Sequence, residues 1–406
     1  MSSANSRILL FTNSYLPVIG GVQTVAHNLA KELIASGHQV RVVTNRFPVK
    51  LPAIENIDGV SIERLLLLQP QLDQLRRKRP DLFLASLYFG PRNSQRIKRI
   101  FQEFKPDVVN VHFPDHQVMP ILKLRGRFPF RLVVSFHGHD IERFIDNPES
   151  NGARERELQN LRTILQSADA LTAVSPDLMR KVEQVEPTVV PKIRVINNGV
   201  DPARFTQKDR YEHSKPYVLA VGRLTYNKGF DLLIDAYARH CSRNRPDLIL
   251  AGDGEEREAL EKQVDRLGLS GNVHFFGHAS PNEIVKLMNG CLSVAMPSRS
   301  ESFGVVALEA VAAGKPLLAT TTGGLQEFLR EIENDARIRH STSGEGQPTI
   351  LFAEPTVEGI AKRIAEIFDK PSRDRGTRDY RLPEKYTWTH IARSYERVLL
   401  GGTPAA

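Results

Sequence analysis

Two pairs of charged residues in the second half of the chain have the types and spacing needed to hold a phosphorylated sugar. Glu301 and Glu309 have seven residues between them, and Arg223 and Lys228 stand in one loop that ends at Gly229. A carboxylate only accepts hydrogen bonds, so it pairs well with the hydroxyls of a sugar or a ribose. Two cations in one loop suit a pyrophosphate, and arginine adds bidentate geometry. The pattern predicts a nucleotide-sugar site, and the alternative is a solvated helix beside a basic surface loop.

Histidines and aspartates gather at the predicted ends of two buried strands in the first half, 107–112 and 130–136. They are His112, Asp115, His116, His137, His139 and Asp140. A neutral imidazole can hydrogen-bond a hydroxyl or carry a proton near neutral pH, and His137 has the favoured place, directly after a strand. These donors also suit zinc, but they lack i, i+4 helical spacing and CxxC pairs, so we expect no metal here. His112, His139 and Asp140 are weaker candidates, with a structural role as the alternative.

Alternating strands and helices must bring these residues together. The chain opens with a predicted strand over 7–12, a loop, a helix over 22–36 and a strand over 39–44, which indicates a parallel sheet. Gly20 and Gly21 in the loop allow backbone to approach a ligand closely, although a plain turn explains them equally well. They do not form the G-x-G-x-x-G fingerprint, which argues against a dehydrogenase.

The charged residues of the second half also follow predicted buried strands. Open parallel sheets bind ligands beyond the carboxyl ends of their strands, and Arg223 and Glu301 both stand at such ends. A helix is predicted to begin at 305. The amides of Phe303 and Gly304 therefore face out of its start, where they and the helix dipole favour phosphate. Gly277, which ends another strand, is a weaker candidate.

In this order the motifs resemble those of the family-four retaining glycosyltransferases of the GT-B fold. The two glutamates match the E-x7-E signature, Arg223 and Lys228 match G-R-x4-K-G, and Ser135-Phe-His-Gly matches the strand-end histidine of that family. The resemblance covers nearly the whole chain and implies an α/β protein of two doubly wound Rossmann-like domains facing across a cleft. We expect 1–198, joined by a returning C-terminal helix at 386–406, to be the acceptor-side domain. Residues 199–385 are then the nucleotide-sugar donor domain.

The resemblance also implies roles for single residues. Arg223, Lys228 and the amides at Phe303 and Gly304 would hold the donor diphosphate. Glu301 and His137 would position the sugar, and Glu309 would meet the ribose. The remaining candidates are Gly20 and Gly21 near the phosphates and acceptor, Gly277 near the base, and His112, His139 and Asp140 on the acceptor side.

The implied reaction transfers a hexosyl unit from a nucleoside diphosphate sugar to a lipid-linked or glycan acceptor, in cell-envelope or exopolysaccharide synthesis. The cations stabilise the leaving diphosphate and no D-x-D motif stands at a suitable strand end, so we expect no cofactor and no metal. The alternatives are a soluble small-molecule acceptor, a nucleotide-sugar epimerase or phosphorylase of the same fold, and a non-catalytic binding protein.

One segment, 330–348, departs from the family pattern. It is long and polar, and 341–347 is predicted to be a loop.

Composition is that of a two-domain globular protein, with 406 residues, 41% hydrophobic and 25% charged. Two cysteines argue against a disulfide framework, and the N-terminus lacks a basic region followed by a long apolar run. We therefore expect no signal peptide and a cytoplasmic protein.

The net charge of +8 lies in the first half, because residues 1–200 hold 27 Lys and Arg against 19 Asp and Glu, and the rest hold 28 against 28. The excess is concentrated in Arg76, Arg77, Lys78, Arg79, Arg92, Arg96, Lys98, Arg99, Lys105, Lys123, Arg125, Arg127 and Arg131. We expect this face to dock an anionic membrane surface from the inner side, and a merely solvated face is the alternative. No nucleic-acid-binding motif occurs, so we expect no nucleic acid.

Overall fold

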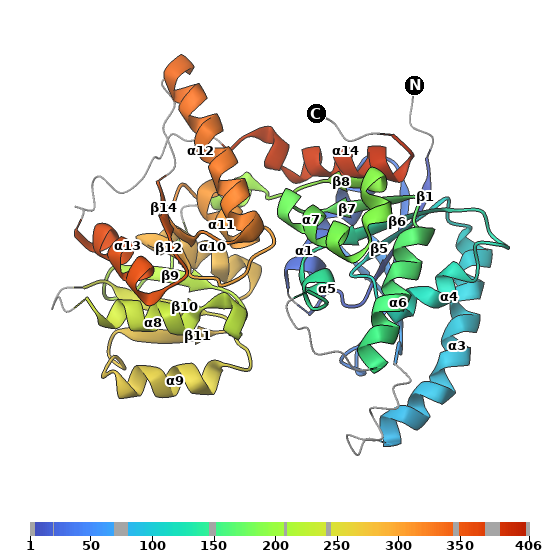
Figure 1. Ribbon diagram of the computed structural model, residues 1–406, viewed down its shortest axis with the longest axis horizontal. Coiled ribbons are helices and arrows are strands. Elements are labelled where there is room, and N and C mark those ends of the chain that lie inside the picture. Colours follow the sequence, from blue (N-terminus) through green and yellow to red (C-terminus); the bar gives the residue numbers. More distant parts are fainter. Residues whose placement is uncertain are drawn as a thin grey trace. The chain divides into compact units, whose positions relative to one another are not determined.

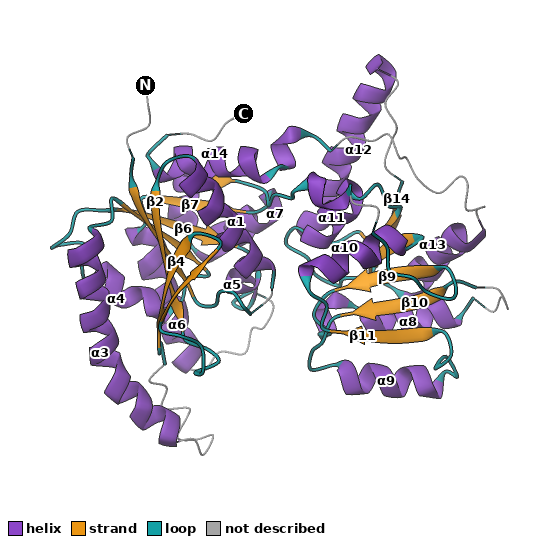
Figure 2. Ribbon diagram, turned by 180° about the vertical axis from the view of Figure 1, so that it is seen from behind, coloured by secondary structure: helices purple, strands orange, loops and turns teal. Residues whose placement is uncertain are grey.

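The computed structural model describes residues 5–18, 20–68, 80–145, 152–206, 209–240, 245–343, 349–369 and 382–402. The chain divides into two compact units. Unit 1 consists of Met1–Asn198 and Trp388–Ala406, and unit 2 consists of Gly199–Thr387. Each unit is a twisted sheet with helices packed on its faces (Figures 1 and 2).

Unit 1 is built on an eight-stranded sheet. Its strands are β1 (Arg7–Thr12), β2 (Gln39–Asn45), β3 (Ile54–Ile57), β4 (Val60–Leu65), β5 (Val108–His112), β6 (Arg131–Phe136), β7 (Ala170–Ala173) and β8 (Ile193–Val195). They lie in the order β3-β4-β2-β1-β5-β6-β7-β8, and only the β3–β4 pair is antiparallel. The central strands are buried on both faces, which explains why they read as continuous apolar runs.

The helices of unit 1 are α1 (Gly21–Ala35), α3 (Pro80–Phe104), α4 (Met119–Leu122), α5 (His139–Glu142), α6 (Gly152–Ser167), α7 (Pro176–Val185) and α14 (Trp388–Leu399). The strand order reverses at β1, because the chain moves to β2 on one side of it and later to β5 on the other. Right-handed crossovers then place α1 on one face of the sheet and α3, α4, α6 and α7 on the opposite face.

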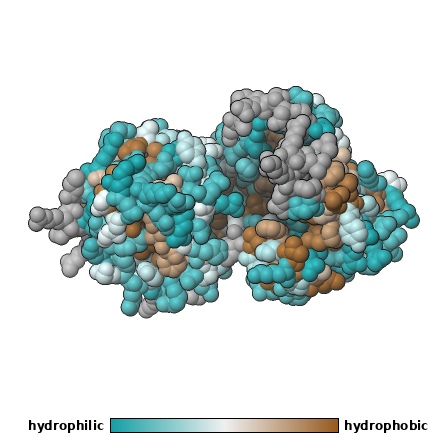
Figure 3. Space-filling view, turned by 90° about the horizontal axis from the view of Figure 1, so that it is seen from below, coloured by the Kyte–Doolittle hydropathy of each residue, from teal (hydrophilic) through white to brown (hydrophobic). Residues whose placement is uncertain are grey.

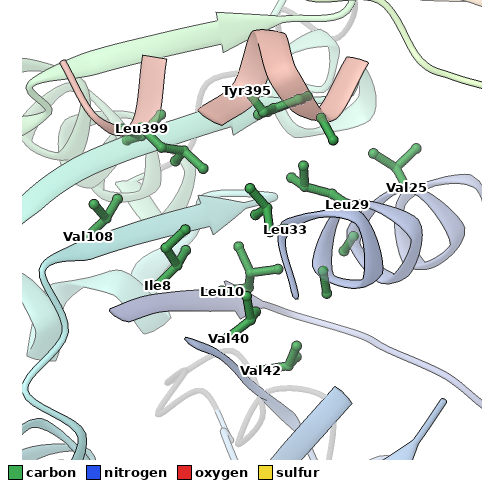
Figure 4. Packing of buried hydrophobic residues seen from close by; sticks show 14 of the residues in the cluster. Ile8, Leu10, Val25, Leu29, Leu33, Val40, Val42, Val108, Tyr395 and Leu399 are labelled. Atoms are coloured by element: carbon green, nitrogen blue, oxygen red, sulfur yellow. The ribbon is translucent and has the colours of Figure 1, made fainter. Parts of the chain in front are cut away.

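The face that carries α1 is completed by α14, from the far end of the chain. Leu29 and Leu33 of α1 and Tyr395 and Leu399 of α14 share one core cluster with the even-numbered residues of β1. Figure 4 shows these side chains pointing toward one another above the strands. In both helices the buried residues recur every three or four positions, as an amphipathic helix requires. The C-terminal helix is therefore part of the core of unit 1.

Unit 2 is built on a six-stranded parallel sheet in the order β11-β10-β9-β12-β13-β14. Its strands are β9 (Tyr217–Val221), β10 (Asp247–Ala251), β11 (Val273–Gly277), β12 (Ser293–Met296), β13 (Leu317–Thr320) and β14 (Ile350–Ala353). Its helices are α8 (Phe230–Ala238), α9 (Arg257–Arg266), α10 (Pro281–Gly290), α11 (Val305–Ala312), α12 (Gly323–Ser343) and α13 (Val357–Asp369). The order reverses at β9, so α8 and α9 cover one face and α10, α11 and α12 the other. Helix α13 joins α8 and α9 in one core cluster.

The prediction of a loop over 341–347 is wrong for its first three residues. Residues 330–343 continue α12, while 344–348 lie outside the described residues. Leu325, Leu329, Ile332 and Ala336 recur at helical spacing and are buried, so one apolar stripe holds a helix whose other faces are polar. Figure 1 shows α12 extending beyond the sheet of unit 2.

Helix α3 begins at Pro80, and Pro91 lies inside it. The carbonyl of Leu87 loses its helical donor there, but Leu87 is exposed, so water can satisfy that carbonyl. Helix α14 begins at Trp388 rather than 386, because Thr387 is extended and Tyr386 is buried against Phe328 within unit 2.

No helix within the described ranges is long and apolar enough to cross a membrane. Helix α3 nevertheless exposes three large apolar side chains near its start, Leu84, Leu87 and Tyr88. Figure 3 shows apolar surface interrupted by polar surface on the face that it displays.

Candidate functional site

The two charged motifs of unit 2 meet where its strand order reverses. β9 and β12 are neighbours in the sheet, yet the chain leaves them toward opposite sides, and such a reversal at the carboxyl edge is where open α/β sheets bind ligands. The loop after β9 carries Lys228, and the loop after β12 carries Glu301. The Lys228 Nζ lies 2.5 Å from the Glu301 Oε2, and both side chains are largely buried. The structure thus brings together a predicted phosphate ligand and a predicted sugar ligand from positions 73 residues apart.

A second ion pair links the loop after β12 to the first turn of α8, which directly follows the loop after β9. Arg299 makes a bidentate contact with Asp231, at 2.7 and 2.6 Å, and also donates to the carbonyl of Tyr226 at 2.8 Å. Its backbone amide donates to the carbonyl of Asn227 at 2.8 Å. Sequence reasoning missed Arg299 and Asp231, although an arginine two residues before Glu301 was a visible signal.

Gly229 explains how closely the loops approach. It has φ 66°, and a Cβ there would lie 2.1 Å from the carbonyl oxygen of Pro297. Any other residue would therefore push the Lys228 loop away from the Glu301 loop. The glycine that ends the G-R-x4-K-G motif is required by packing between two loops.

Arg223 is exposed at the start of its loop and makes no ion pair or side-chain hydrogen bond with any residue that the structure describes. The side chain of Phe303 is buried against Phe328, with ring centroids 4.6 Å apart, so only its backbone can face a ligand. Gly304 precedes α11 with φ 94°, a conformation that favours glycine. The first amides of α11 and the guanidinium of Arg223 are thus each available to an anion.

Glu309 lies on α11, one turn beyond the loop that carries Glu301. Its partly exposed carboxylate has no hydrogen-bond partner among the described residues. Loss of hydration raises the pKa of Glu309 to about 7, and the positive charge of Arg204 offsets this in part. Because no described residue donates a hydrogen bond to it, the Glu309 carboxylate can accept hydrogen bonds from the hydroxyls of a ligand.

Gly277 ends β11 with φ 81° and lies on the same carboxyl edge. Its carbonyl accepts from the amide of Gly252, and a Cβ on Gly252 would lie 1.8 Å from the carbonyl of Gly222. Three consecutive loops thus pack backbone to backbone next to Arg223. Sequence reasoning did not single out Gly252, because the sequence around it is typical of an ordinary turn.

In unit 1, His112 and His137 come together at the ends of neighbouring strands β5 and β6. The His112 Nδ1 and the His137 Nε2 are 2.9 Å apart, and the rings are stacked with centroids 5.2 Å apart. The His112 Nε2 is buried and has no partner among the described residues, which is tolerable for a lone pair but costly for an N–H. The proton of His112 therefore belongs on Nδ1, which donates to His137.

This pairing sets the tautomer of His137. Its Nε2 accepts from His112, so the neutral ring carries its proton on Nδ1. Burial lowers the pKa of His137 to about 4 and also holds the pKa of His112 well below its usual value. His137 is thus a neutral hydrogen-bond donor at physiological pH, which suits it to orient a hydroxyl rather than to act as an acid.

Asp140 supports the loop that carries His137. Its carboxylate accepts from the amides of His137 at 3.0 Å and Gly138 at 2.8 Å, and it is fully buried. Burial raises the pKa of Asp140 to about 6. Asp140 therefore positions the strand end, whereas His139 is exposed and stacks on Phe113.

The glycine pair of unit 1 stands at the start of α1. Gly20 is extended, at φ −178°, so no special backbone conformation explains it. No atom of the described residues lies within 4 Å of the position that a Cβ on Gly21 would take. Nearby, Asn13 donates to Asp115 at 2.8 Å and accepts from Gln117 at 2.7 Å, which ties the loop after β1 to the loop after β5. Sequence reasoning did not find this network, because Asn13 and Gln117 follow no motif.

Among the described side chains, no third histidine, cysteine or carboxylate joins His112 and His137 closely enough to hold a metal ion. The side chain of His116 lies outside the described part of the chain.

Comparison with known proteins identifies the family. Residues 19–204 match the family model described as Glycosyltransferase Family 4, and residues 203–381 match Glycosyl transferases group 1. An uncharacterized glycosyltransferase of Methanocaldococcus jannaschii is 30% identical over 413 residues, an alignment covering 97% of each chain. The chain is a family-four glycosyltransferase of the GT-B fold. The sequence-based predictions of family and fold class are thereby confirmed.

The glycosyltransferase also resembles other proteins along nearly its whole length. Glycogen synthase of Mycobacterium tuberculosis is 28% identical over 411 residues, covering 97% of this chain and 94% of that protein. The Anabaena protein HepE, solved in complex with UDP and glucose, superimposes with a TM-score of 0.68 at 20% identity, covering 98% of this chain and 100% of HepE. The second likeness concerns the fold of the glycosyltransferase alone.

Proposed function

We propose that this glycosyltransferase moves a hexosyl unit from a nucleoside diphosphate sugar to a lipid-linked or glycan acceptor, with retention of configuration. Unit 2 binds the donor and unit 1 contributes the acceptor side. The observation that carries the proposal is the meeting of Lys228 and Glu301 at the strand reversal of unit 2. Arg223 is on the same loop as Lys228, and α11 begins directly after the loop that carries Glu301.

The donor diphosphate binds beside the cations of the loop after β9. Lys228 and Arg223 supply two charges, and the amides at Phe303 and Gly304 supply fixed dipoles. Negative charge grows on the diphosphate as the glycosidic bond breaks, so these groups bind the transition state more tightly than the ground state. The leaving phosphate accepts the proton of the acceptor hydroxyl, and no metal ion or cofactor takes part.

The carboxylates and His137 orient the sugar nucleotide. Glu301 meets the transferred sugar, and Glu309 meets the ribose hydroxyls. His137 donates from Nδ1 to a hydroxyl, since its Nε2 is engaged by His112. His139, Gly20 and Gly21 line the acceptor side, and Gly277 lies near the base.

The relatives support the donor and acceptor classes. HepE, which shares the fold, was solved with UDP and glucose. Glycogen synthase, which aligns along nearly the whole chain, supports a glycan acceptor. Exposed apolar residues at the start of α3, next to Arg92, favour an acceptor presented at a lipid surface, in cell-envelope or exopolysaccharide synthesis.

A thermal-shift screen of purified protein against a panel of nucleotide sugars tests the donor assignment, because a ligand that binds the native state raises its Tm. We expect a small set of nucleoside diphosphate sugars to raise the Tm of the wild type and to lose this effect in Lys228→Ala. Lys262→Ala, an exposed lysine on α9, is the matched control.

NMR of the product made with the stabilising donor then reports the anomeric configuration. No stabilisation by any nucleotide sugar would refute the donor site. An inverted product would refute retention alone.

A further inference from the structure

Three metal-binding side chains converge in unit 2 on the edge of the sheet away from the donor residues. His213 precedes β9, Asp247 is the first residue of β10, and His274 is the second residue of β11. The Nε2 atoms of both histidines lie close to the same carboxylate oxygen, Oδ2 of Asp247, at 2.9 and 3.0 Å. The donor atoms of all three residues lie within 4.8 Å of one another.

The separations match a small tetrahedral site. Zinc bonds of 2.0–2.1 Å to nitrogen and oxygen place neighbouring ligand atoms about 3.3 Å apart. The two N···O distances are a few tenths of an ångström shorter, so an ion can enter with small side-chain rotations. The ring edges are reachable, because His213 and His274 are 15% and 38% exposed, whereas Asp247 is almost fully buried at 3%.

The second oxygen of Asp247 is held separately. Asn272 donates to Oδ1 at 3.0 Å, and the Lys215 Nζ lies 3.5 Å from the same atom. Carboxylates that bind a metal through one oxygen commonly have the other fixed in this way by surrounding donors. The arrangement leaves Oδ2 as the single oxygen directed between the two imidazoles.

We propose that His213, Asp247 and His274 bind one zinc ion, with water in the fourth position. Two imidazoles and one carboxylate are a donor set that zinc accepts, and neutral histidines bind it through Nε2 when their single ring proton is on Nδ1.

The ion serves the fold rather than the transfer reaction. The cluster lies at the amino ends of β9, β10 and β11, while Arg223, Lys228 and Gly277 lie at or beyond their carboxyl ends. A five-residue strand rises about 3.3 Å per residue, so the two edges are roughly 15 Å apart. The ion joins the edge strand β11 and the segment before β9 to β10. It thereby links these three segments at the amino ends of the strands.

Zinc titration of the full chain tests the site. Protein prepared without a histidine tag and stripped with a chelator is titrated with Zn²⁺ against a chromophoric competitor, and with Co²⁺ to record its visible spectrum. We expect one equivalent of zinc per chain, the intense visible bands of tetrahedral cobalt, and a Tm that rises with free zinc. Chelation should lower the Tm while the initial rate of sugar transfer at moderate temperature stays unchanged.

Substitution by glutamine separates metal binding from folding. In His213→Gln and His274→Gln the amide can still donate to Asp247, so the fold is kept while zinc affinity falls by about a hundredfold or more. His240→Gln, another partly buried histidine of unit 2, should bind zinc as the wild type does. A wild type that binds no zinc, or glutamine variants that bind it unchanged, would overturn the site. Either outcome leaves the donor assignment standing.

Discussion

The ammonium group of Lys228 and the carboxylate of Glu301 neutralise each other when no donor is present. Their 2.5 Å contact keeps two charges in place on a partly buried edge of the sheet. A donor that brings a diphosphate and sugar hydroxyls offers each group its own partner. Binding therefore exchanges one ion pair for two sets of contacts, and removal of either residue leaves the other without a counter-charge.

The first prediction concerns the two cations. Arg223→Ala and Lys228→Ala should each lower kcat by on the order of a hundredfold, because each removes a fixed positive charge from the leaving diphosphate. Steady-state kinetics with the preferred donor measures the loss, and circular dichroism with thermal melting checks the fold. Near wild-type rates in both variants would remove the diphosphate assignment.

The second prediction concerns Glu309 and pH. Its pKa is raised to about 7, so the free protein loses this proton as pH rises through neutrality. Ribose hydroxyls favour the ionised form. Below pH 7 donor binding must therefore release the proton, and affinity should weaken by up to about tenfold per pH unit.

Donor Kd measured by calorimetry from pH 5.5 to 8 should thus fall with rising pH and level off above pH 7. Glu309→Gln should bind more weakly at pH 8 and show a flat profile. The phosphates of a nucleotide sugar do not titrate in this range. An unchanged slope in the glutamine variant would assign the titration to another group.

At the scale of elements, the donor site depends on how two loops are fastened. The loops after β9 and β12 are joined by the Arg299–Asp231 pair, by the backbone contact of Arg299 with Asn227, and by the close approach at Gly229. None of these groups needs to touch the donor. Their effect is to hold the Lys228 and Glu301 side chains at a fixed separation.

The third prediction tests this fastening. Arg299→Lys keeps the charge but loses the bidentate geometry, so the Lys228 and Glu301 side chains are held less firmly in their relative positions. We therefore expect kcat to fall by on the order of ten- to a hundredfold. Arg239→Lys is the control, because Arg239 pairs with Glu358 away from these loops. If Arg299→Lys lowers only the Tm, with kcat intact, the pair is purely structural.

The fourth prediction concerns α14. Leu399 is fully buried in the cluster with α1, whereas its neighbour Leu400 is 42% exposed. Leu399→Ala should lower the free energy of unfolding of unit 1 by about 2–5 kcal/mol, and Leu400→Ala should change it by less than about 0.5 kcal/mol. Denaturant titration measures both. Equal effects would mean that α14 does not contribute to the core as Figure 4 shows it.

For the whole molecule, the predicted basic face is only partly available to a partner. Arg96 pairs with Glu63, Arg125 with Asp169, and Arg131 donates to the carbonyl of Val398. Arg92 and Arg99 remain exposed on α3, while the cluster 76–79 lies outside the described residues. Apolar side chains near the start of the same helix give this face a mixed character that suits the surface of an anionic bilayer.

The fifth prediction is that the protein sediments with anionic vesicles but not with neutral ones, and that high salt weakens this binding. Leu84→Ser combined with Leu87→Ser should reduce pelleting, because both side chains are more than half exposed on α3. Leu267→Ser, an exposed leucine of unit 2, is the control. Equal pelleting with both lipids, or none with either, would refute membrane docking and leave the transferase assignment intact.

The sequence alone determined the class of fold and the positions of the main strands. Short, mostly apolar runs such as 7–12 and 107–112 are typical of strands buried on both faces, and polar residues or glycines that follow such runs mark the carboxyl edge. Arg223, Lys228, Glu301 and Glu309 could be named because their spacing and chemistry are local properties of the chain.

Only the tertiary structure decided which of these residues meet. The Lys228–Glu301 contact depends on β9 and β12 being neighbours, and local patterning does not encode the neighbours of a strand. The same holds for the Arg299–Asp231 pair, the tautomer of His137 and the convergence of His213, Asp247 and His274. Each joins positions more than twenty residues apart, and the fold brings them together through packing of the whole sheet.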